Sequence, residues 1–150
     1  MKKILTALLA LIMLAGCSGG GAALDIDTRR AAKTIADGIG VTNDQLMEAP
    51  KEVIDEWYTF DDKVTDFTVY VSATGGTANE IAVVKSTDAS TAEASLERRV
   101  ENLKTRFQDY VPAEMVKLES PVIVTKDGVA VMVLADDTAK AEKLINEVLR

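Results

Sequence analysis

The single cysteine of the chain, Cys17, has the most clearly defined chemistry in the sequence. It closes the pattern Leu14-Ala15-Gly16-Cys17, in which small residues precede a cysteine whose thiol accepts diacylglycerol before cleavage after Gly16. An apolar run from Ile4 to Leu14 follows two lysines and has about half of the ~20 residues that a membrane-spanning helix needs. These features predict a lipoprotein signal peptide over residues 1–16 and lipidation of Cys17. The alternative is an ordinary secretory signal with a chance cysteine.

Lipidation of Cys17 predicts where the mature protein is held. We expect acyl chains such as palmitate to anchor it to the extracytoplasmic face of the cell membrane, because two chains give stable attachment. Residues 17–24 form a short lipidated tether in this interpretation, and residues 25–150 form one domain. Residues 16–20 also match the nucleophile elbow of serine hydrolases. Signal cleavage would cut that motif, however, and the chain has no histidine to act as its base.

Composition excludes several chemistries. The chain has no histidine and lipidation consumes its one thiol, so disulfides, thiol nucleophiles, Cys/His zinc sites and histidine triads are not available. Without the signal peptide, 134 of the 150 residues remain, with 15 of the 17 basic side chains against 24 acidic ones and a formal net charge of −9. This charge argues against nucleic acid as a partner and against adsorption to an anionic membrane. We expect no cofactor and no metal.

The densest cluster of charge lies between residues 37 and 66, where nine acidic side chains accompany only Lys51 and Lys63. Clustered carboxylates are the ligands that Ca²⁺ prefers, but their spacing does not match an EF-hand loop. A solvated acidic face is the favoured interpretation. The nine residues are Asp37, Asp44, Glu48, Glu52, Asp55, Glu56, Asp61, Asp62 and Asp66.

Three of the aromatic residues lie together in the same segment: Trp57, Tyr58 and Phe60. Such a group is suited to stacking on a sugar ring of a wall glycan. It is equally suited to filling the core where helices meet a sheet, and this second interpretation is favoured.

Other charged residues could form a site only if the fold brought them together. Glu80 and Lys85 flank one predicted strand, and their odd spacing places them on opposite faces, so we expect edge or end charges. A basic group on the following helix could bind an anion, although a solvated helix face is favoured. The adjacent pair Asp136-Asp137 is explained by helix capping better than by catalysis. The basic group consists of Arg98, Arg99 and Arg106.

The N-terminal part of the domain predicts two helices. Asp27 can cap the first, whose apolar residues Ala31, Ile35 and Ile39 recur every four positions. Residues 42–45, Thr-Asn-Asp-Gln, form a capping-box pattern for a short second helix, and Pro50 suits a first helical turn. A strand through 53–60 is the less favoured alternative.

The rest of the chain alternates hairpins and helices. Period-two alternation from Val64, a turn at 74–77 and a second strand at 80–85 predict one hairpin. Strands at 122–126 and 129–135 around Asp127-Gly128 predict another, with the second strand central and covered on both sides. A capping box at Ser90 opens a helix with Leu96, Val100, Leu103 and Phe107 buried, and residues 112–118 add a turn or two. Asp136 or Asp137 caps the last helix.

These elements predict an α+β fold. We expect a four-stranded, mainly antiparallel sheet built from the two hairpins, in which strand–strand–helix occurs twice after the two N-terminal helices. The two later helices would pack on one face, and the N-terminal helices on the other. An uncovered apolar face would instead mark a dimer or partner surface.

Several short motifs follow one another along the chain in a characteristic order. They are the lipid-attachment pattern, Thr77-Ala78-Asn79-Glu80-Ile81-Ala82 with Lys85, Arg98-Arg99, Phe107-Gln108-Asp109-Tyr110 with Pro112, and Lys126-Asp127-Gly128. From about residue 40 to its end the chain therefore resembles the lipoproteins of Gram-positive anaerobes known as domain of unknown function 4358. The resemblance implies a cell-surface protein of Gram-positive type. It implies no activity and no functional residue.

Three functions remain open. The favoured one is a non-catalytic binding or interaction module at the cell surface, with a protein, a wall glycan or a small solute as partner. The second is a structural or assembly subunit of an envelope complex, or a homodimer. The third, and least favoured, is a cell-wall hydrolase that uses carboxylates, which requires two converging acids in a cleft. An exposed apolar sheet face would favour a protein partner, and a pocket lined by Trp57 or Tyr58 a glycan or solute.

Overall fold

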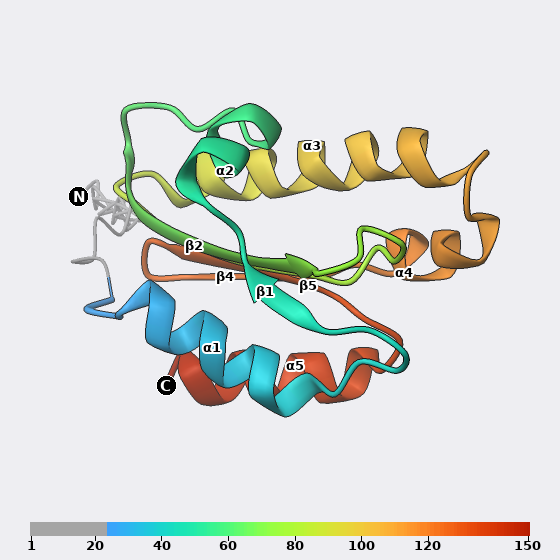
Figure 1. The fold of residues 1–150 in the computed structure, drawn as a ribbon. Helices are drawn as coiled ribbons and strands as arrows, with labels where there is room; N and C mark the ends of the chain where they lie inside the picture. Colours follow the sequence, from blue (N-terminus) through green and yellow to red (C-terminus); the bar gives the residue numbers. More distant parts are fainter. Residues whose placement is uncertain (1–23) are drawn as a thin grey trace, which may run out of the picture.

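The computed structural model describes residues 24–150, and the predicted signal peptide and Cys17 lie outside this range. The described chain forms three layers, with helices on both faces of one five-stranded sheet (Figure 1). All neighbouring strands are antiparallel, and their order is β1-β2-β3-β5-β4. The predicted α+β class is thus confirmed, although the sheet has five strands rather than four.

Both predicted hairpins are present. Strands β2 (Val64–Ser72) and β3 (Glu80–Ser86) form the first, and β4 (Val122–Lys126) and β5 (Val129–Leu134) form the second. In the second hairpin Lys126 pairs with Val129 and Val124 with Val131, as the two-residue turn predicts. Strand β5 lies between β3 and β4 and is buried at every position, which confirms it as a central strand.

The fifth strand is β1 (Leu46–Glu48), which occupies the stretch predicted to open a second helix. Thr42-Asn43-Asp44-Gln45 therefore caps no helix, and this prediction is wrong. The Asp44 carboxylate is instead held by the β2–β3 loop, while Leu46–Glu48 pairs with Tyr70–Ser72. The short helix begins later as α2 (Lys51–Trp57). Pro50 is its N-cap, one position before the first turn in which the sequence predicts it.

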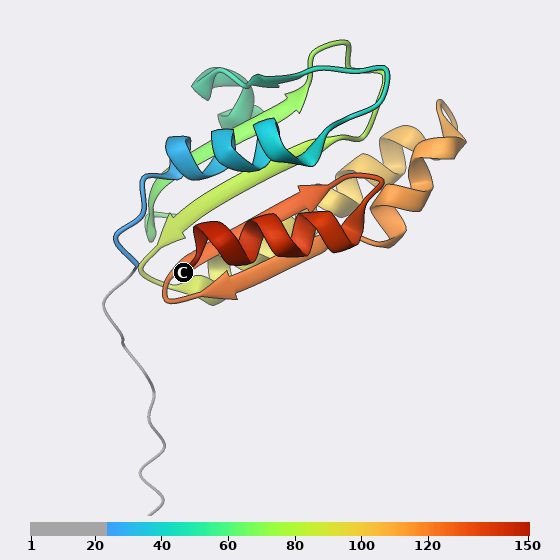
Figure 2. The ribbon, with the colours of Figure 1, turned by 90° about the horizontal axis from the view of Figure 1, so that it is seen from below.

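The two long later helices lie on opposite faces of the sheet, so their predicted placement on one face is wrong. Helix α3 (Ala89–Phe107) covers one face together with α2, whereas α1 (Thr28–Ile39) and α5 (Thr138–Val148) lie side by side on the other (Figure 2). Both faces of β3 and β5 are apolar and must be removed from water. Helix α3 already covers β3, β5 and β4 on its face, so α5 packs on β4 and β5 from the other face, beside α1.

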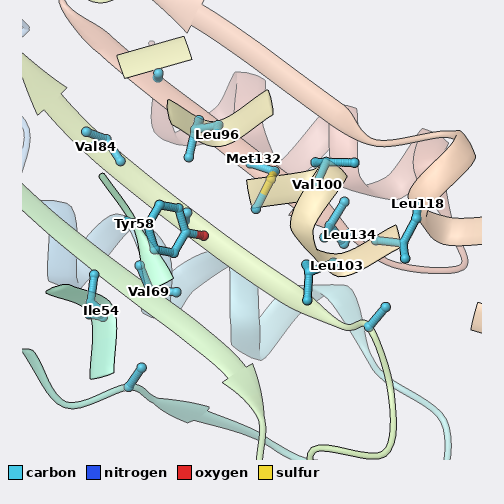
Figure 3. Close-up of a cluster of buried hydrophobic side chains, with 14 of the residues drawn as sticks. Ile54, Tyr58, Val69, Val84, Leu96, Val100, Leu103, Leu118, Met132 and Leu134 are labelled. Atoms are coloured by element: carbon cyan, nitrogen blue, oxygen red, sulfur yellow. The ribbon is translucent and has the colours of Figure 1, made fainter. Parts of the chain in front are cut away.

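Each face has its own apolar core. On the α3 face, Leu96, Val100, Leu103 and Phe107 are buried, as their spacing predicts, against alternate residues of β3 and β5 (Figure 3). On the α1–α5 face, the buried residues include Ile35, Ile39 and Ile145. After α3, the chain forms a single 3₁₀ turn (η1, Pro112–Glu114) and α4 (Met115–Glu119), which confirms the predicted helical turns.

Helix caps fix where the longer helices begin. The carboxylates of Asp27 and Asp137 accept the amides of Arg30 and Lys140, so both predicted aspartate caps are confirmed. Helix α3 is capped by Asp88 rather than Ser90, two residues earlier than predicted, and the Asp88 carboxylate accepts the amide of Ser90. None of the helices within residues 24–150 is long and apolar enough to cross a membrane.

Candidate functional site

Glu80 and Arg99 form an ion pair inside the protein, which corrects two predictions. Arg99 is 7% exposed and not on a solvated helix face, and Glu80, although it is the first residue of β3 as an end charge would be, is only 3% exposed. The Arg99 guanidinium donates from Nε to Oε1 at 2.9 Å and from Nη2 to Oε2 at 2.8 Å. The pKa of Arg99 is raised because these bonds and the charge of Glu80 outweigh the desolvation that lowers it. Lys85 lies on the opposite face of β3, as predicted, near Asp25.

The aromatic group covers this pair, which confirms the core interpretation. Tyr58 is buried and its hydroxyl donates to Glu80, while the guanidinium of Arg99 lies 4.5 Å from the ring centroid of Trp57. Burial, together with the negative charge of Glu80, raises the pKa of Tyr58 well above its usual range. Phe60 stacks on Tyr58 at 5.1 Å and packs against the same core. These rings hold α2 on the sheet.

The three arginines of the predicted basic group do not all lie on the same side of α3. Arg98 is exposed and does not join Arg99, whereas Arg106 lies over the ring of Phe107 at 5.6 Å and lines the same small cavity as Arg99. The nine acids of residues 37–66 are also dispersed. Asp37 and Asp55 each pair with a lysine one helical turn away, and no three acidic side chains within the described range lie close enough to hold a metal ion.

One of the nine acids, Asp44, forms a polar network that the sequence did not reveal. Its carboxylate accepts from the hydroxyls of Ser72 and Thr77 and from Nδ2 of Asn79. Partial burial raises the pKa of Asp44, but these hydrogen bonds and the amide of Gln45 outweigh it and lower the pKa. The network joins Asp44, which precedes β1, to the β2–β3 loop.

A concave site lies where the sheet is open. Strand β1 pairs only with the last residues of β2, and the amide of Ala49 makes the final bond, to the carbonyl of Val69. Pro50 then turns the chain into α2, and it has no amide hydrogen to continue the ladder. Within the described chain, residues 64–68 of β2 have no strand neighbour on that side.

This open edge lies in a cavity of about 500 Å³, which we call the edge slot. One wall is the start of α1, where the Thr28 hydroxyl donates to Asp66 at 2.8 Å and lies 3.0 Å from the hydroxyl of Thr68. The other wall is α2, with Lys51 and Ile54. The slot therefore reaches both faces of β2 and exposes the backbone between them. Its lining is formed by residues 27–29, 48–51, 54 and 65–69.

Each carboxylate in the edge slot has its own partner. Asp27 accepts the amide of Arg30, and Glu48 pairs with Arg29 at 2.7 Å. Asp66 accepts from the Thr28 hydroxyl and, at 3.0 Å, from the backbone amide of Phe67 in the open stretch of β2. The acids face three different groups rather than one shared centre. A second cavity of about 430 Å³ adjoins the slot and shares Lys51 and Phe67 with it. Its aromatic wall continues from Phe67 to Phe60, with ring centroids 4.9 Å apart.

Comparisons with known proteins identify a lipid attachment site and a protein family. Residues 1–18 match the prokaryotic membrane lipoprotein lipid attachment site, so the chain is a lipid-anchored membrane lipoprotein. Searches of curated proteins and of solved structures found no match. The family model of domain of unknown function 4358 matches residues 40–135, from the end of α1 to the end of β5. With well over half of its length matched, the chain belongs to the family of domain of unknown function 4358.

Proposed function

We propose that the mature protein is a non-catalytic binding module, held by lipid on Cys17 at the extracytoplasmic face of a Gram-positive cell membrane, and that it binds an extended polypeptide segment in the edge slot. The single observation that carries this proposal is the unpaired half of β2 lying in a cavity between α1 and α2. An added strand would continue the line of β1 beyond the point where Pro50 leaves the sheet.

The shape of the edge slot favours a polypeptide over a sugar or a solute. Both faces of the sheet are covered by helices, and what remains is the edge of β2 at residues 64–68, where the amide of Phe67 is held by the Asp66 side chain and not by a strand. Tyr58 lines the adjoining cavity, but its hydroxyl is committed to Glu80. That cavity combines the half-buried rings of Phe60 and Phe67 with exposed Lys51, Asp55 and Asp61, which suits a side chain of a bound strand that has an apolar stem and a polar tip.

The carboxylates of the slot support a non-catalytic role. A carboxylate hydrolase needs one acid with a raised pKa beside a second, ionised one. Asp27 is used as a helix cap and Glu48 in an ion pair with Arg29, so their oxygens are directed to these partners.

Selection of peptides tests the proposal. Random seven-residue peptides displayed on phage are selected against the mature chain carrying Cys17→Ser, and amide chemical shifts are then recorded with the peptides recovered. We expect the largest shifts at residues 65–69, with few changes on α5. Recovered peptides that shift only amides outside the slot, or no recovered peptides at all, would overturn it.

A matched pair of substitutions sharpens the test. Lys51→Trp fills the slot, whereas Lys143→Trp adds the same ring to an exposed position of α5. The first should weaken peptide binding at least ~10-fold, about 1.4 kcal/mol, and the second should leave it unchanged. If the protein instead sediments as a dimer that Lys51→Trp separates, the occupant of the slot is a second copy.

A further inference from the structure

The described chain begins at one end of the domain, where four segments meet. The amide of Leu24 donates to the carbonyl of Asp127 at 2.7 Å, in the turn of the β4–β5 hairpin. The amide of Ser86 donates to the carbonyl of Gly128 at 2.8 Å, and that of Thr87 to Lys63 at 2.9 Å. We call this the proximal end; it lies at the left of Figure 1.

The C-terminus lies at the same end. Lys126 Nζ donates to the carbonyl of Leu149 at 2.6 Å, beside the hairpin turn. Asp25 and Lys85 approach each other here at 3.7 Å. Acidic and basic side chains are nearly balanced at this end, so it is not a basic patch that would attract anionic lipid by charge. The acidic ones are Asp25, Asp61, Asp62, Asp88 and Asp127, and the basic ones Lys63, Lys85, Lys126 and Arg150.

The opposite end, which we call the distal end, is formed by the corner between α3 and α4 and by the β2–β3 loop (Figure 1). Helix α3 runs between the two ends, from its cap Asp88 to Phe107. Its 19 residues span about 28 Å at the rise of an α-helix. The distal end carries two large apolar side chains, Tyr110 and Val116, which are 80% and 70% exposed.

Chain length decides which end lies at the bilayer. Seven residue steps separate the lipidated Cys17 from Leu24. They span at most about 25 Å when fully extended, and about 13–16 Å as a root-mean-square distance for a chain rich in glycine. The proximal end therefore lies within reach of the lipid headgroups, whereas the distal end lies farther by the length of α3.

We infer that the lipoprotein has a defined orientation, with its proximal end facing the lipid headgroups and the α3–α4 corner facing away from the membrane. The partner of the proximal end is a bilayer surface, which it meets because the lipid holds it there and not through charge. Tyr110 and Val116 are consequently presented outward, where soluble partners approach. The edge slot opens on the side of the domain, since β2 runs from the proximal to the distal end.

Energy transfer from a label to the bilayer measures this orientation. Because lipidation consumes the only thiol, one introduced cysteine is labelled uniquely. Asp62→Cys at the proximal end and Asp109→Cys at the distal end form a matched pair, because both replace an exposed aspartate. Each full-length lipoprotein is produced in a host that processes lipoproteins and is added to phosphatidylglycerol–phosphatidylcholine vesicles with acceptors on the headgroups.

We expect transfer from position 62 to be at least ~2-fold more efficient than from position 109, because the sites differ by about the 28 Å length of α3. We also expect little change between low and high salt. Equal transfer from both positions, or greater transfer from position 109, would overturn the inferred orientation. The same labels in a Cys17→Ser background separate the two proposals: transfer that persists there would mean that lipid on Cys17 is not the anchor.

Discussion

Arg99 of α3 and Glu80 of β3 form two parallel hydrogen bonds, from Nε to Oε1 at 2.9 Å and from Nη2 to Oε2 at 2.8 Å. Tyr58 donates to the same carboxylate and Trp57 covers the guanidinium, so one ion pair joins the sheet, α3 and the end of α2. Burying two charges is costly, and the geometry of the pair offsets that cost only when both partners are present.

Removing one partner of this ion pair should therefore destabilise the protein strongly. Arg99→Met leaves the Glu80 carboxylate buried without its cation, and we expect the free energy of unfolding to fall by about 3–5 kcal/mol in urea denaturation. Arg98→Met is the control, because Arg98 is exposed and should change stability by less than about 0.5 kcal/mol.

The double variant Glu80→Leu with Arg99→Met distinguishes lost charge compensation from lost packing. It should recover part of the stability lost in Arg99→Met, since no unpaired charge then remains. A double variant as unstable as the two single losses added together would contradict this account.

The hydroxyl of Tyr58 provides a smaller test of the same site. Tyr58→Phe keeps the ring in the core but removes the donor to Glu80, and should lower the free energy of unfolding by about 1.5–3 kcal/mol. Tyr110→Phe removes a hydroxyl from a side chain that is 80% exposed and should have no measurable effect. Equal stabilities of the two variants would contradict the buried hydrogen bond.

The cap of α3 makes stability depend on pH. Hydrogen bonds and charge from Lys63 and hydrogen bonds from Ser90 lower the pKa of Asp88 to about 2 from the ordinary 3.8. The folded state therefore binds fewer protons at this group than the unfolded state, so its contribution is complete above pH 3.8 and is lost as the pH falls through about 2. The Tm difference between wild type and Asp88→Asn should shrink over this range, whereas Asp109→Asn should track the wild type.

The β4–β5 turn tests backbone conformation. Asp127 and Gly128 both have positive φ, 45° and 80°, as a type I′ turn requires. Gly128→Ala should lower the free energy of unfolding by about 1 kcal/mol or more, because alanine is strained there. Gly76→Ala is the matched control, since Gly76 lies in the other hairpin loop without a positive φ. A more stable Gly128→Ala variant would contradict the turn assignment.

Attachment to the membrane should depend on the sulfur atom of Cys17. Cys17→Ser replaces the thiol that we propose accepts diacylglycerol, and we expect the protein to lose both incorporated palmitate and its place in the membrane fraction. Ser18→Ala leaves the attachment pattern intact and should behave as the wild type. Membrane association of the Cys17→Ser protein would show that another contact holds it.

The sequence by itself determined the local elements of this protein, because their signals lie within a few residues. Asp127-Gly128 set the turn and the pairing of β4 with β5. The spacing of Leu96, Val100 and Leu103 set the buried face of α3. The lipid-attachment pattern ending at Cys17 is equally local, and its match to known lipoproteins rests on consecutive residues.

The positions of Arg99 and Glu80 in the sequence indicate that they are buried, but their charge argues against burial. Arg99 lies three residues after Leu96, on the buried side of α3, and Glu80 alternates with Ala82 and Val84 toward the same face. Charged residues are almost never buried unless they are paired, so their partner must be known before they can be placed in a core. That partner lies 19 residues away on another element.

Only the tertiary structure decided the rest. Leu46–Glu48 is a strand because Tyr70–Ser72 offers an edge, which overrides the capping-box pattern that precedes it. The helices α3 and α5 lie on opposite faces because α3 already covers β3, β5 and β4 on its own face, which depends on the strand order of the whole sheet and not on either helix. The edge slot exists because the chain turns away from the sheet at Pro50, so that β1 ends beside the longer β2. Segments far apart in the sequence form this slot, and no local pattern predicts it.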